Sequence, residues 1–260
     1  MLICPVCGEK VMLCDKVMRC GNGHSFDVAK EGYVNLLRSS KSGDLIGDDK
    51  ISARMRRDFL NKGYYAPLME ELCRIFADKK GNVLDICCGE GYYTSALGEN
   101  SNLNVFGFDI AREMVRLAAK RGKGTYFVAN MANIPIGEGS MDYCTHMFAP
   151  FNESAVAKVL KDGGRLYTVI PGRFHLWGLK QAVYDTPYEN DEILPQTLQL
   201  RLISQRKVTA NITLNCQEDI QAVFRMTPYF FHTSQRDKDK LLGLDALETS
   251  IEFVIGEYEK

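Results

Sequence analysis

The chain has 260 residues, 45% of them apolar, which is enough for one large α/β domain plus a small module. Its net charge of −1 excludes a general attraction to nucleic acid, so any RNA-binding surface must come from local clusters of basic residues. The sequence shows no charged start followed by an apolar run, no stretch of ~20 apolar residues and no disulfide-type cysteine spacing, so we expect a cytoplasmic protein without a membrane role.

The first predicted unit, residues 1–37, is rich in cysteine and too small to fold on an apolar core of its own. Cys4 and Cys7 form a CxxC pair, and after twelve residues Cys20 and His24 form a CxxxH pair. This spacing is typical of a structural Cys3His zinc site, whose four protein ligands leave no position for water or substrate. Cys14 lies between the pairs and is interpreted as a spare thiol. The alternative is a group of free thiols without a metal.

The stretch 38–50 is polar, contains glycine and lacks periodicity, which indicates a linker. Apolar residues recur at helical spacing from 51 to 76, with an interruption at Gly63 and Pro67, and predict two helices. Beyond them, short runs of β-branched and aromatic residues alternate with helix-like stretches. This alternation predicts a doubly wound, mostly parallel Rossmann-like α/β sheet in a second domain, residues 51–260.

A glycine-containing turn follows the first predicted strand of the second domain. The stretch "VLDICCGEGYYTSALG" places Asp85 at the strand end and Gly89 and Gly91 before a helix, where backbone amides can meet a ligand. A dinucleotide site needs GxGxxG, but its third glycine falls on Thr94, which weakens that interpretation. Asp109 ends the next strand, where a carboxylate can accept hydrogen bonds from ribose hydroxyls. The alternative is that the two aspartates only cap strands.

The same stretch resembles motif I of class I S-adenosylmethionine-dependent methyltransferases, D-x-G-x-G-x-G, with Cys87 at the first glycine. The resemblance implies a seven-stranded methyltransferase sheet. It also implies that Asp85, Gly89, Gly91 and Asp109 form part of the cofactor site. The stretch "VANMANIPIGEGSMD" follows the third strand, where such enzymes hold the adenine, here with Asn130 or Met131.

The whole arrangement resembles the 23S ribosomal RNA (guanine-N1)-methyltransferases of the RlmA family. The stretches that carry this resemblance are "CPVC", "HSFDVAKEGYVNLL", "RRDFLNKGYYAPL", "DICCGEGYYT" and "IPGRFHL", and it extends to about residue 185. It implies methylation of guanine N1 in a hairpin of 23S rRNA, a structural zinc ion in each chain, and a homodimer. At matching positions it implies zinc ligation by Cys4, Cys7, Cys20 and His24, and contacts to S-adenosylmethionine from Tyr65, Gly89, Glu90 and His175.

The acceptor and the RNA are assigned to two further segments. Lys50, Arg54, Arg56 and Arg57 are expected to contact phosphates collectively, although each alone fits a solvated helix face. The loop "THMFAPFNES" after the fourth strand should face the acceptor, because ligands in open α/β sheets bind beyond the carboxyl ends of strands.

That loop supplies His146 as a possible base, Phe148 as a possible stacking surface, and Phe151. These side chains fit pocket lining or core equally well, so the catalytic residue stays unassigned. Two other functions remain open: a methyltransferase of the same fold for another RNA or a small, quinone-like acceptor, and a non-catalytic RNA-binding protein. A zinc module speaks against a small acceptor, which needs no separate recognition unit.

Overall fold

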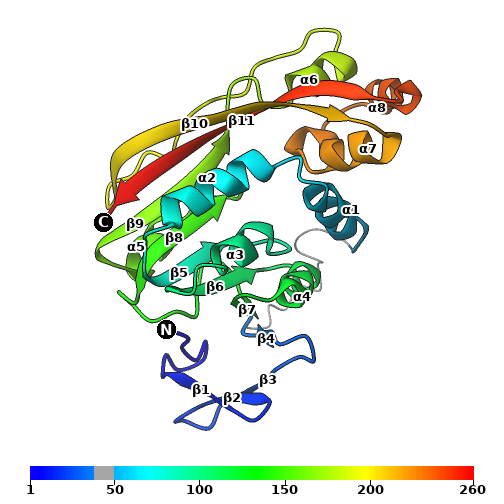
Figure 1. Ribbon diagram of the computed structural model, residues 1–260. Helices are drawn as coiled ribbons and strands as arrows, with labels where there is room; N and C mark the ends of the chain where they lie inside the picture. Colours follow the sequence, from blue (N-terminus) through cyan, green and yellow to red (C-terminus); the bar gives the residue numbers. More distant parts are fainter. Residues whose placement is uncertain (38–49) are drawn as a thin grey trace.

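The computed structural model describes residues 1–37 and 50–260 (Figure 1). The predicted linker, 38–50, therefore lies outside the described residues except for Lys50, which begins a helix. A small antiparallel sheet near the N-terminus contains β1 (Val11–Cys14), β2 (Val17–Cys20) and β3 (Ser25–Asp27). The rest of the described chain is organised around one eight-stranded sheet.

The central sheet has the strand order β10-β11-β9-β8-β5-β6-β7-β4. Pairing is parallel from β4 to β9, whereas β11 runs antiparallel to both β9 and β10. This is the predicted doubly wound, mostly parallel sheet, with β4 as an additional edge strand. The strands are β4 (Val34–Asn35), β5 (Gly81–Ile86), β6 (Leu103–Asp109), β7 (Thr125–Val128), β8 (Met141–Met147), β9 (Leu160–Pro171), β10 (Arg201–Leu214) and β11 (Leu247–Glu259).

The helices connect these strands and cover the sheet (Figure 1). They are α1 (Lys50–Asn61), α2 (Ala66–Phe76), α3 (Tyr92–Leu97), α4 (Arg112–Arg121), α5 (Glu153–Val159), α6 (Trp177–Val183), α7 (Gln217–Arg225) and α8 (Gln235–Asp239), with 3-10 turns η1 (Pro228–Phe231) and η2 (Lys240–Gly243). The predicted interruption between the first two helices is present. Gly63 has φ +80°, and Pro67 stands in the first turn of α2, where its missing N–H costs no hydrogen bond.

The N-terminal module packs directly on the central sheet. β4 pairs with β7 in parallel, the Leu36 N–H donates to the Val128 carbonyl at 2.9 Å, and the Ile3 N–H donates to the Pro135 carbonyl at 2.9 Å. The apolar side chains of the module share one buried cluster with the sheet: Leu2, Val11, Val34 and Leu36 with Phe108, Phe127 and Ile136. The module therefore covers part of one face of the sheet.

The strand order fixes where a ligand can bind. β5 lies between β6 and β8. The chain continues from β6 to β7 on one side of β5, and from β8 to β9 on the other. In doubly wound sheets the crevice for ligands opens at this reversal, beyond the carboxyl ends of the strands. The ends of β5, β6 and β8 and the segments after them hold the predicted glycine turn, Asp109 and the predicted acceptor loop, whereas Tyr65, Asn130, Met131 and His175 lie elsewhere.

Candidate metal centre and active site

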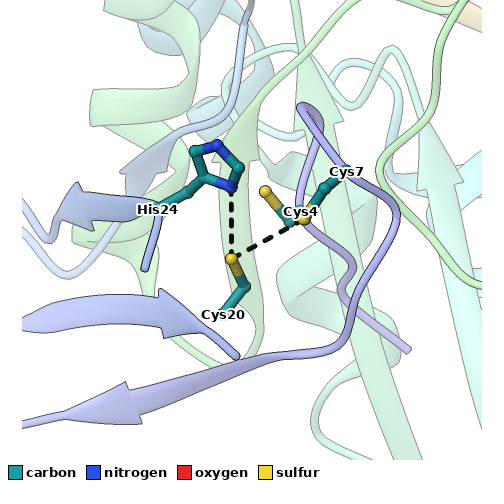
Figure 2. Close-up of side chains that lie close together, drawn as sticks. All are labelled: Cys4, Cys7, Cys20 and His24. Atoms are coloured by element: carbon teal, nitrogen blue, oxygen red, sulfur yellow. Dashed lines mark hydrogen bonds between the residues drawn. The ribbon is translucent and has the colours of Figure 1, made fainter. Parts of the chain in front are cut away.

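Four potential metal ligands converge in the N-terminal module (Figure 2). The ligand atoms of Cys4, Cys7, Cys20 and His24 all lie within 4.8 Å of one another. The sulfurs of Cys7 and Cys20 are 3.7 Å apart, and the Cys20 sulfur is 3.4 Å from Nδ1 of His24. With Zn–S about 2.3 Å and Zn–N about 2.0–2.1 Å, tetrahedral ligation requires about 3.8 Å and about 3.5 Å. The donor set and its spacing therefore fit zinc.

Two similar turns present these ligands. The Gly8 N–H donates to the Cys4 carbonyl at 2.9 Å, and the Gly23 N–H donates to the Cys20 carbonyl at 3.1 Å. Gly8 and Gly23 have φ +78° and +83°, a left-handed conformation that favours glycine. Each turn thus brings two ligands together within a few residues, as the CxxC and CxxxH spacings predict.

The environment of the cluster favours the thiolate at one of its cysteines. A hydrogen bond from the Glu9 backbone N–H, followed by one from the Asn22 side chain, lowers the pKa of Cys7 to about 6. Burial instead raises the pKa of Cys4, and a bound cation would favour its thiolate. Cys14, the predicted spare, is exposed at the end of β1 and lies outside the cluster.

A cavity of about 270 Å³ lies beyond the carboxyl ends of β5, β6 and β8; we call it the first cavity. Its wall includes the turn after β5, the turn after β6 and the loop after β8, and it also includes Arg56 and Leu60 of α1. The residues in its wall are Arg56, Leu60, Cys87, Cys88, Gly89, Glu90, Tyr92, Tyr93, Asp109, Ile110, Ala111, Met114, Met147, Phe148, Ala149 and Pro150. Three predicted cofactor residues, Gly89, Glu90 and Asp109, are among them.

The turn after β5 has the backbone conformation of a glycine-rich loop. Cys87, Gly89 and Gly91 have φ +57°, +55° and +81°. Cys87 thus adopts the left-handed conformation that explains why the motif has glycine at this position. The Gly89 N–H donates to Oδ2 of Asp109 at 3.0 Å, and the Ala111 N–H donates to Oδ1 at 2.9 Å. These bonds hold the Asp109 carboxylate at the cavity wall, where ribose hydroxyls can reach it.

Asp85 lies beneath the turn and does not line the cavity. Its side chain is 1% exposed and accepts hydrogen bonds from the hydroxyls of Thr94 and Thr145, the latter at 2.8 Å. Burial raises the pKa of Asp85 to about 6, although both hydroxyls lower it. The carboxylate joins the ends of β5 and β8 to the first turn of α3, so its visible role is to position the turn.

Glu90 and Gly91 have structural partners of their own. The Glu90 carboxylate is buried and accepts two hydrogen bonds from Arg121 of α4, at 2.6 and 2.9 Å. A Cβ atom at Gly91 would lie 2.8 Å from Cβ of Ala118, so glycine allows α3 to begin against α4. Contacts from Glu90 and Gly91 to a cofactor stay predictions.

Tyr93 provides a test of whether the first cavity suits a polar ligand. Tyr93 lines the cavity, and its hydroxyl is buried and has no hydrogen-bond partner within the described part of the chain. Such an orphaned hydroxyl is rare unless a ligand or water satisfies it. With the Gly89 turn and the Asp109 carboxylate in its wall, the cavity fits S-adenosylmethionine, which carries ribose hydroxyls and an amino-acid end.

Asn130 and Met131 lie outside the wall of the first cavity. They follow β7, and the Asn130 side chain accepts a hydrogen bond from the Ala132 N–H at 2.9 Å. Asn130 is exposed and Met131 is half-buried against the cluster that contains the N-terminal module. Their contact with adenine stays a prediction.

A second cavity, of about 360 Å³, adjoins the first, and Arg56, Phe148 and Ala149 line both. Its wall comes from α1, the residue before α2, the end of β8 and the loop after it, β9, and the segments around residues 175, 190 and 228. The residues are Arg56, Tyr65, His146, Phe148, Ala149, Phe151, Thr168, Val169, Ile170, Pro171, His175, Leu176, Asn190, Pro195, Met226, Thr227, Pro228 and Tyr229. Tyr65 and His175, predicted to contact the cofactor, thus line the second cavity and not the first.

Tyr65 and His175 form a defined hydrogen-bond relay. The Glu252 N–H donates to Nδ1 of His175 at 3.2 Å, and Nε2 lies 3.2 Å from the Tyr65 hydroxyl oxygen. Burial lowers the pKa of His175 to about 3, so the ring is neutral. Because Nδ1 accepts from the Glu252 N–H, the one ring proton is on Nε2. His175 therefore donates to the Tyr65 oxygen, and the Tyr65 hydroxyl hydrogen is left for a ligand in the cavity.

The loop after β8, which the sequence predicts to face the acceptor, also reaches the second cavity. His146 is buried, with Nδ1 3.2 Å from the Thr168 hydroxyl and Nε2 3.1 Å from the Pro150 carbonyl. Because the carbonyl only accepts, Nε2 carries the proton and Nδ1 accepts from Thr168, so both nitrogens are engaged. Phe148 has φ +54° and is 45% exposed at the junction of the cavities. Backbone strain of this kind concentrates at functional sites.

Several residues of these cavities carry no sequence signal that could have singled them out. The tertiary fold brings four such residues to the walls or to the residues that support them: Tyr93, Arg121, Asn190 and Tyr229. Of these, only Tyr93 is near a recognised motif.

No helix in residues 1–37 and 50–260 is both long and apolar enough to cross a membrane.

Comparison with known proteins agrees with both parts of the structure. Residues 2–41 match a family model described as "RlmA, N-terminal", a zinc ribbon, and residues 83–166 match one described as "Methyltransferase domain". The chain is 33% identical over 190 residues to the 23S rRNA (guanine(748)-N(1))-methyltransferase of Streptomyces fradiae, covering 70% of this chain and 67% of that protein.

Two further similarities are weaker. The Bacillus subtilis protein YxjB, to which a 23S rRNA (guanine-N(1)-)-methyltransferase activity is provisionally assigned, is 26% identical and covers 93% of this chain and 90% of its own length. The crystal structure of YcgJ from Bacillus subtilis superposes with a TM-score of 0.47 at 17% identity, over 76% of this chain and 99% of that one.

Proposed function

We propose, from the premise that this chain belongs to the 23S ribosomal RNA (guanine-N1)-methyltransferase family, that it methylates N1 of a guanine in a hairpin of 23S rRNA with S-adenosylmethionine. The observation that carries this proposal is the pair of adjoining cavities. One adjoins the motif I turn and the other is lined by aromatic residues, and Phe148 lies at their junction. The zinc module packed on the same sheet supports an RNA substrate.

S-adenosylmethionine supplies an activated methyl group, so no covalent enzyme intermediate is required. The residues of this chain would hold it in the first cavity: the Gly89 turn and Asp109 toward the ribose, and Tyr93 toward a polar group. Holding donor and acceptor in line supplies much of the rate acceleration. Tyr65 and His175 could serve either ligand, because the second cavity opens beside the first.

The second cavity is suited to a base that has left its stack. N1 of guanine lies on the Watson–Crick edge, so a paired guanine must open or flip before it can react. Phe148, Phe151 and Tyr229 provide aromatic walls, and the Tyr65 hydroxyl provides a hydrogen-bond donor for an acceptor such as O6. The cavity therefore offers both stacking and recognition of one base.

Phosphate contacts can come from α1 and the N-terminal module. Lys50 and Arg54 are exposed on α1, whereas Arg56 and Arg57 are half-buried and Arg56 reaches both cavities. These residues connect a backbone-binding surface to the base-binding cavity. We also propose that the target lies in an RNA hairpin and that the protein is a homodimer. The zinc module would end at residue 37, and the methyltransferase domain would begin at residue 51. A chain that modifies ribosomal RNA works where that RNA is, so we also propose a cytoplasmic location.

The test is tritiated methyl transfer to ribosomal RNA from a strain that lacks the gene. We expect label in 23S rRNA and a reverse-transcriptase stop at one guanine, because a methyl on N1 blocks pairing. Asp109→Asn should weaken cofactor binding and reduce the label, whereas Cys14→Ser should not. Label in a quinone fraction alone would favour the small-acceptor alternative, and a lack of cofactor binding by calorimetry would favour a non-catalytic protein.

A further inference from the structure

Lys180 is a buried cation beside the second cavity. It lies on α6, is 0% exposed, and its ammonium donates to the Tyr188 carbonyl at 2.8 Å and to Oδ1 of Asn190 at 2.7 Å. The ammonium is also 4.2 Å from the ring centroid of Tyr188 and 5.5 Å from that of Tyr229. Neutral oxygens and aromatic faces thus solvate the charge.

Most carboxylates of the surrounding segments form ion pairs with other cations. Asp185 pairs with Lys240 at 2.8 Å, Glu189 with Arg173 at 3.2 Å, Glu192 with Lys207 at 2.8 Å, and Glu252 of β11 with Lys207 at 2.6 Å. Exposed Asp191 attracts the ammonium through space, while burial lowers the pKa of Lys180. On the side of the cavity lie His175 and Tyr229, which burial keeps neutral. A positive field therefore reaches the cavity.

The contacts of Lys180 form part of the cavity wall. Asn190 and Tyr229 both line the second cavity. The Asn190 amide, held by Lys180, donates in turn to the Gly172 carbonyl at 3.0 Å and to the His175 carbonyl at 3.3 Å. The charge is thus separated from the cavity by a single layer of side chains.

The wall of the second cavity contains no aspartate or glutamate among the described residues. Its titratable members are Arg56, Tyr65, His146, His175 and Tyr229. The ring nitrogens of the two histidines are engaged in the bonds described above. Guanine N1 carries a proton that must leave before methylation, and the described wall of this cavity offers no carboxylate to take it. A cationic surrounding with hydroxyl donors instead favours an anionic base.

We propose that Lys180 positions the wall of the second cavity and that its charge favours the N1-deprotonated, anionic form of the acceptor guanine. The N1–H bond breaks, its electron pair stays on the base over N1 and O6, and the proton leaves to solvent. Tyr65 and Arg56 face the cavity as donors for the developing charge on O6. This inference rests on the proposed function, because it concerns the acceptor of that reaction.

The experiment measures single-turnover methylation of a 23S rRNA hairpin transcript between pH about 6.5 and about 9.5. Lys180→Gln removes the charge but can still donate to the Asn190 and Tyr188 oxygens. Coulomb's law at an effective dielectric constant of about 20 gives a shift on the order of one pKa unit. We expect a rate about tenfold lower at neutral pH and within about twofold of the wild type at the alkaline end.

Lys180→Arg should restore the wild-type pH profile, because it retains the charge. Lys240→Gln is the matched control. Lys240 also donates to a backbone carbonyl, that of Val183 at 3.0 Å, but it lies outside the cavity wall and should leave the profile unchanged. An equal fractional loss for Lys180→Gln at every pH would overturn the proposal, since a purely structural role predicts that result.

A measurement on the wild type covers the case in which Lys180→Gln does not fold. The pKa read from its pH–rate profile should lie below the pKa of N1 in the free hairpin, which is measured by titration. Equal pKa values for the rate profile and the free hairpin would contradict the proposal. No methylation by the wild type at any pH would instead refute the proposed function itself.

Discussion

Gly91→Ala should destabilise the protein through one close approach between helices. Gly91 has φ +81°, a conformation that costs a residue with a Cβ atom about 1 kcal/mol. The added Cβ would lie 2.8 Å from Cβ and 2.9 Å from Cα of Ala118, and the latter is backbone that cannot rotate away. Overpacking of this kind costs about 1–3 kcal/mol. We therefore expect a loss of roughly 2–4 kcal/mol, or roughly 5–15 °C in Tm.

Gly89→Ala is the matched control, because the two glycines share one turn. Gly89 also has a positive φ, +55°, but a Cβ there would meet no atom within 4 Å and would project toward the first cavity. Gly89→Ala should lose about 1 kcal/mol of stability. The loss of binding free energy for S-adenosylmethionine should be larger. Calorimetry of binding and thermal melts separate the two variants. If Gly91→Ala melts like the wild type, the close-packing explanation is wrong.

Three more results are expected. Cys20→Ser should lose zinc and lower Tm, whereas Cys14→Ser should keep one zinc per chain by atomic spectroscopy; equal zinc loss in both would contradict the assigned ligand set. Cys87→Gly should change the free energy of unfolding by less than about 1 kcal/mol and retain methyl transfer, because φ +57° already suits glycine, whereas Cys87→Val should cost about 2 kcal/mol. Folding raises the pKa of Asp85 from its ordinary 3.8 to about 6, so its stabilising contribution is complete below about pH 4 and is lost as pH rises to about 6. Urea titrations across that range should show this slope in the wild type and not in Asp85→Asn.

The parts of the site that depend on neighbouring residues were predictable from the sequence. The zinc ligands come in two pairs whose members are three or four residues apart, so their spacing alone indicates a shared ion. The turn after β5 is equally local, and its glycines predicted a turn at this point; that Cys87 adopts the left-handed conformation is a finding of the structure. The alternation of strands and helices predicted the parallel sheet, because the crossover rule leaves few other arrangements.

Contacts between distant segments could not be predicted in the same way. Tyr65 and Glu252 meet across His175, and periodicity says nothing about such a contact. The sequence also missed β4, since two residues carry too little pattern to indicate a strand. Asp85 lies beneath the turn and does not line the first cavity; the sequence shows that a carboxylate ends a strand but not which way its hydrogen bonds run.

The pairing of β4 with β7 has a consequence for synthesis on the ribosome. Val34 pairs with Phe127, so the N-terminal module leaves the ribosome long before the surface it covers exists. At about 5–20 residues per second that interval lasts roughly 5–20 s. During it, zinc is what can hold the module together, and its apolar side chains stay exposed until β6 and β7 arrive. A shortage of zinc should therefore reduce the yield of newly made protein more than the stability of protein that has already folded.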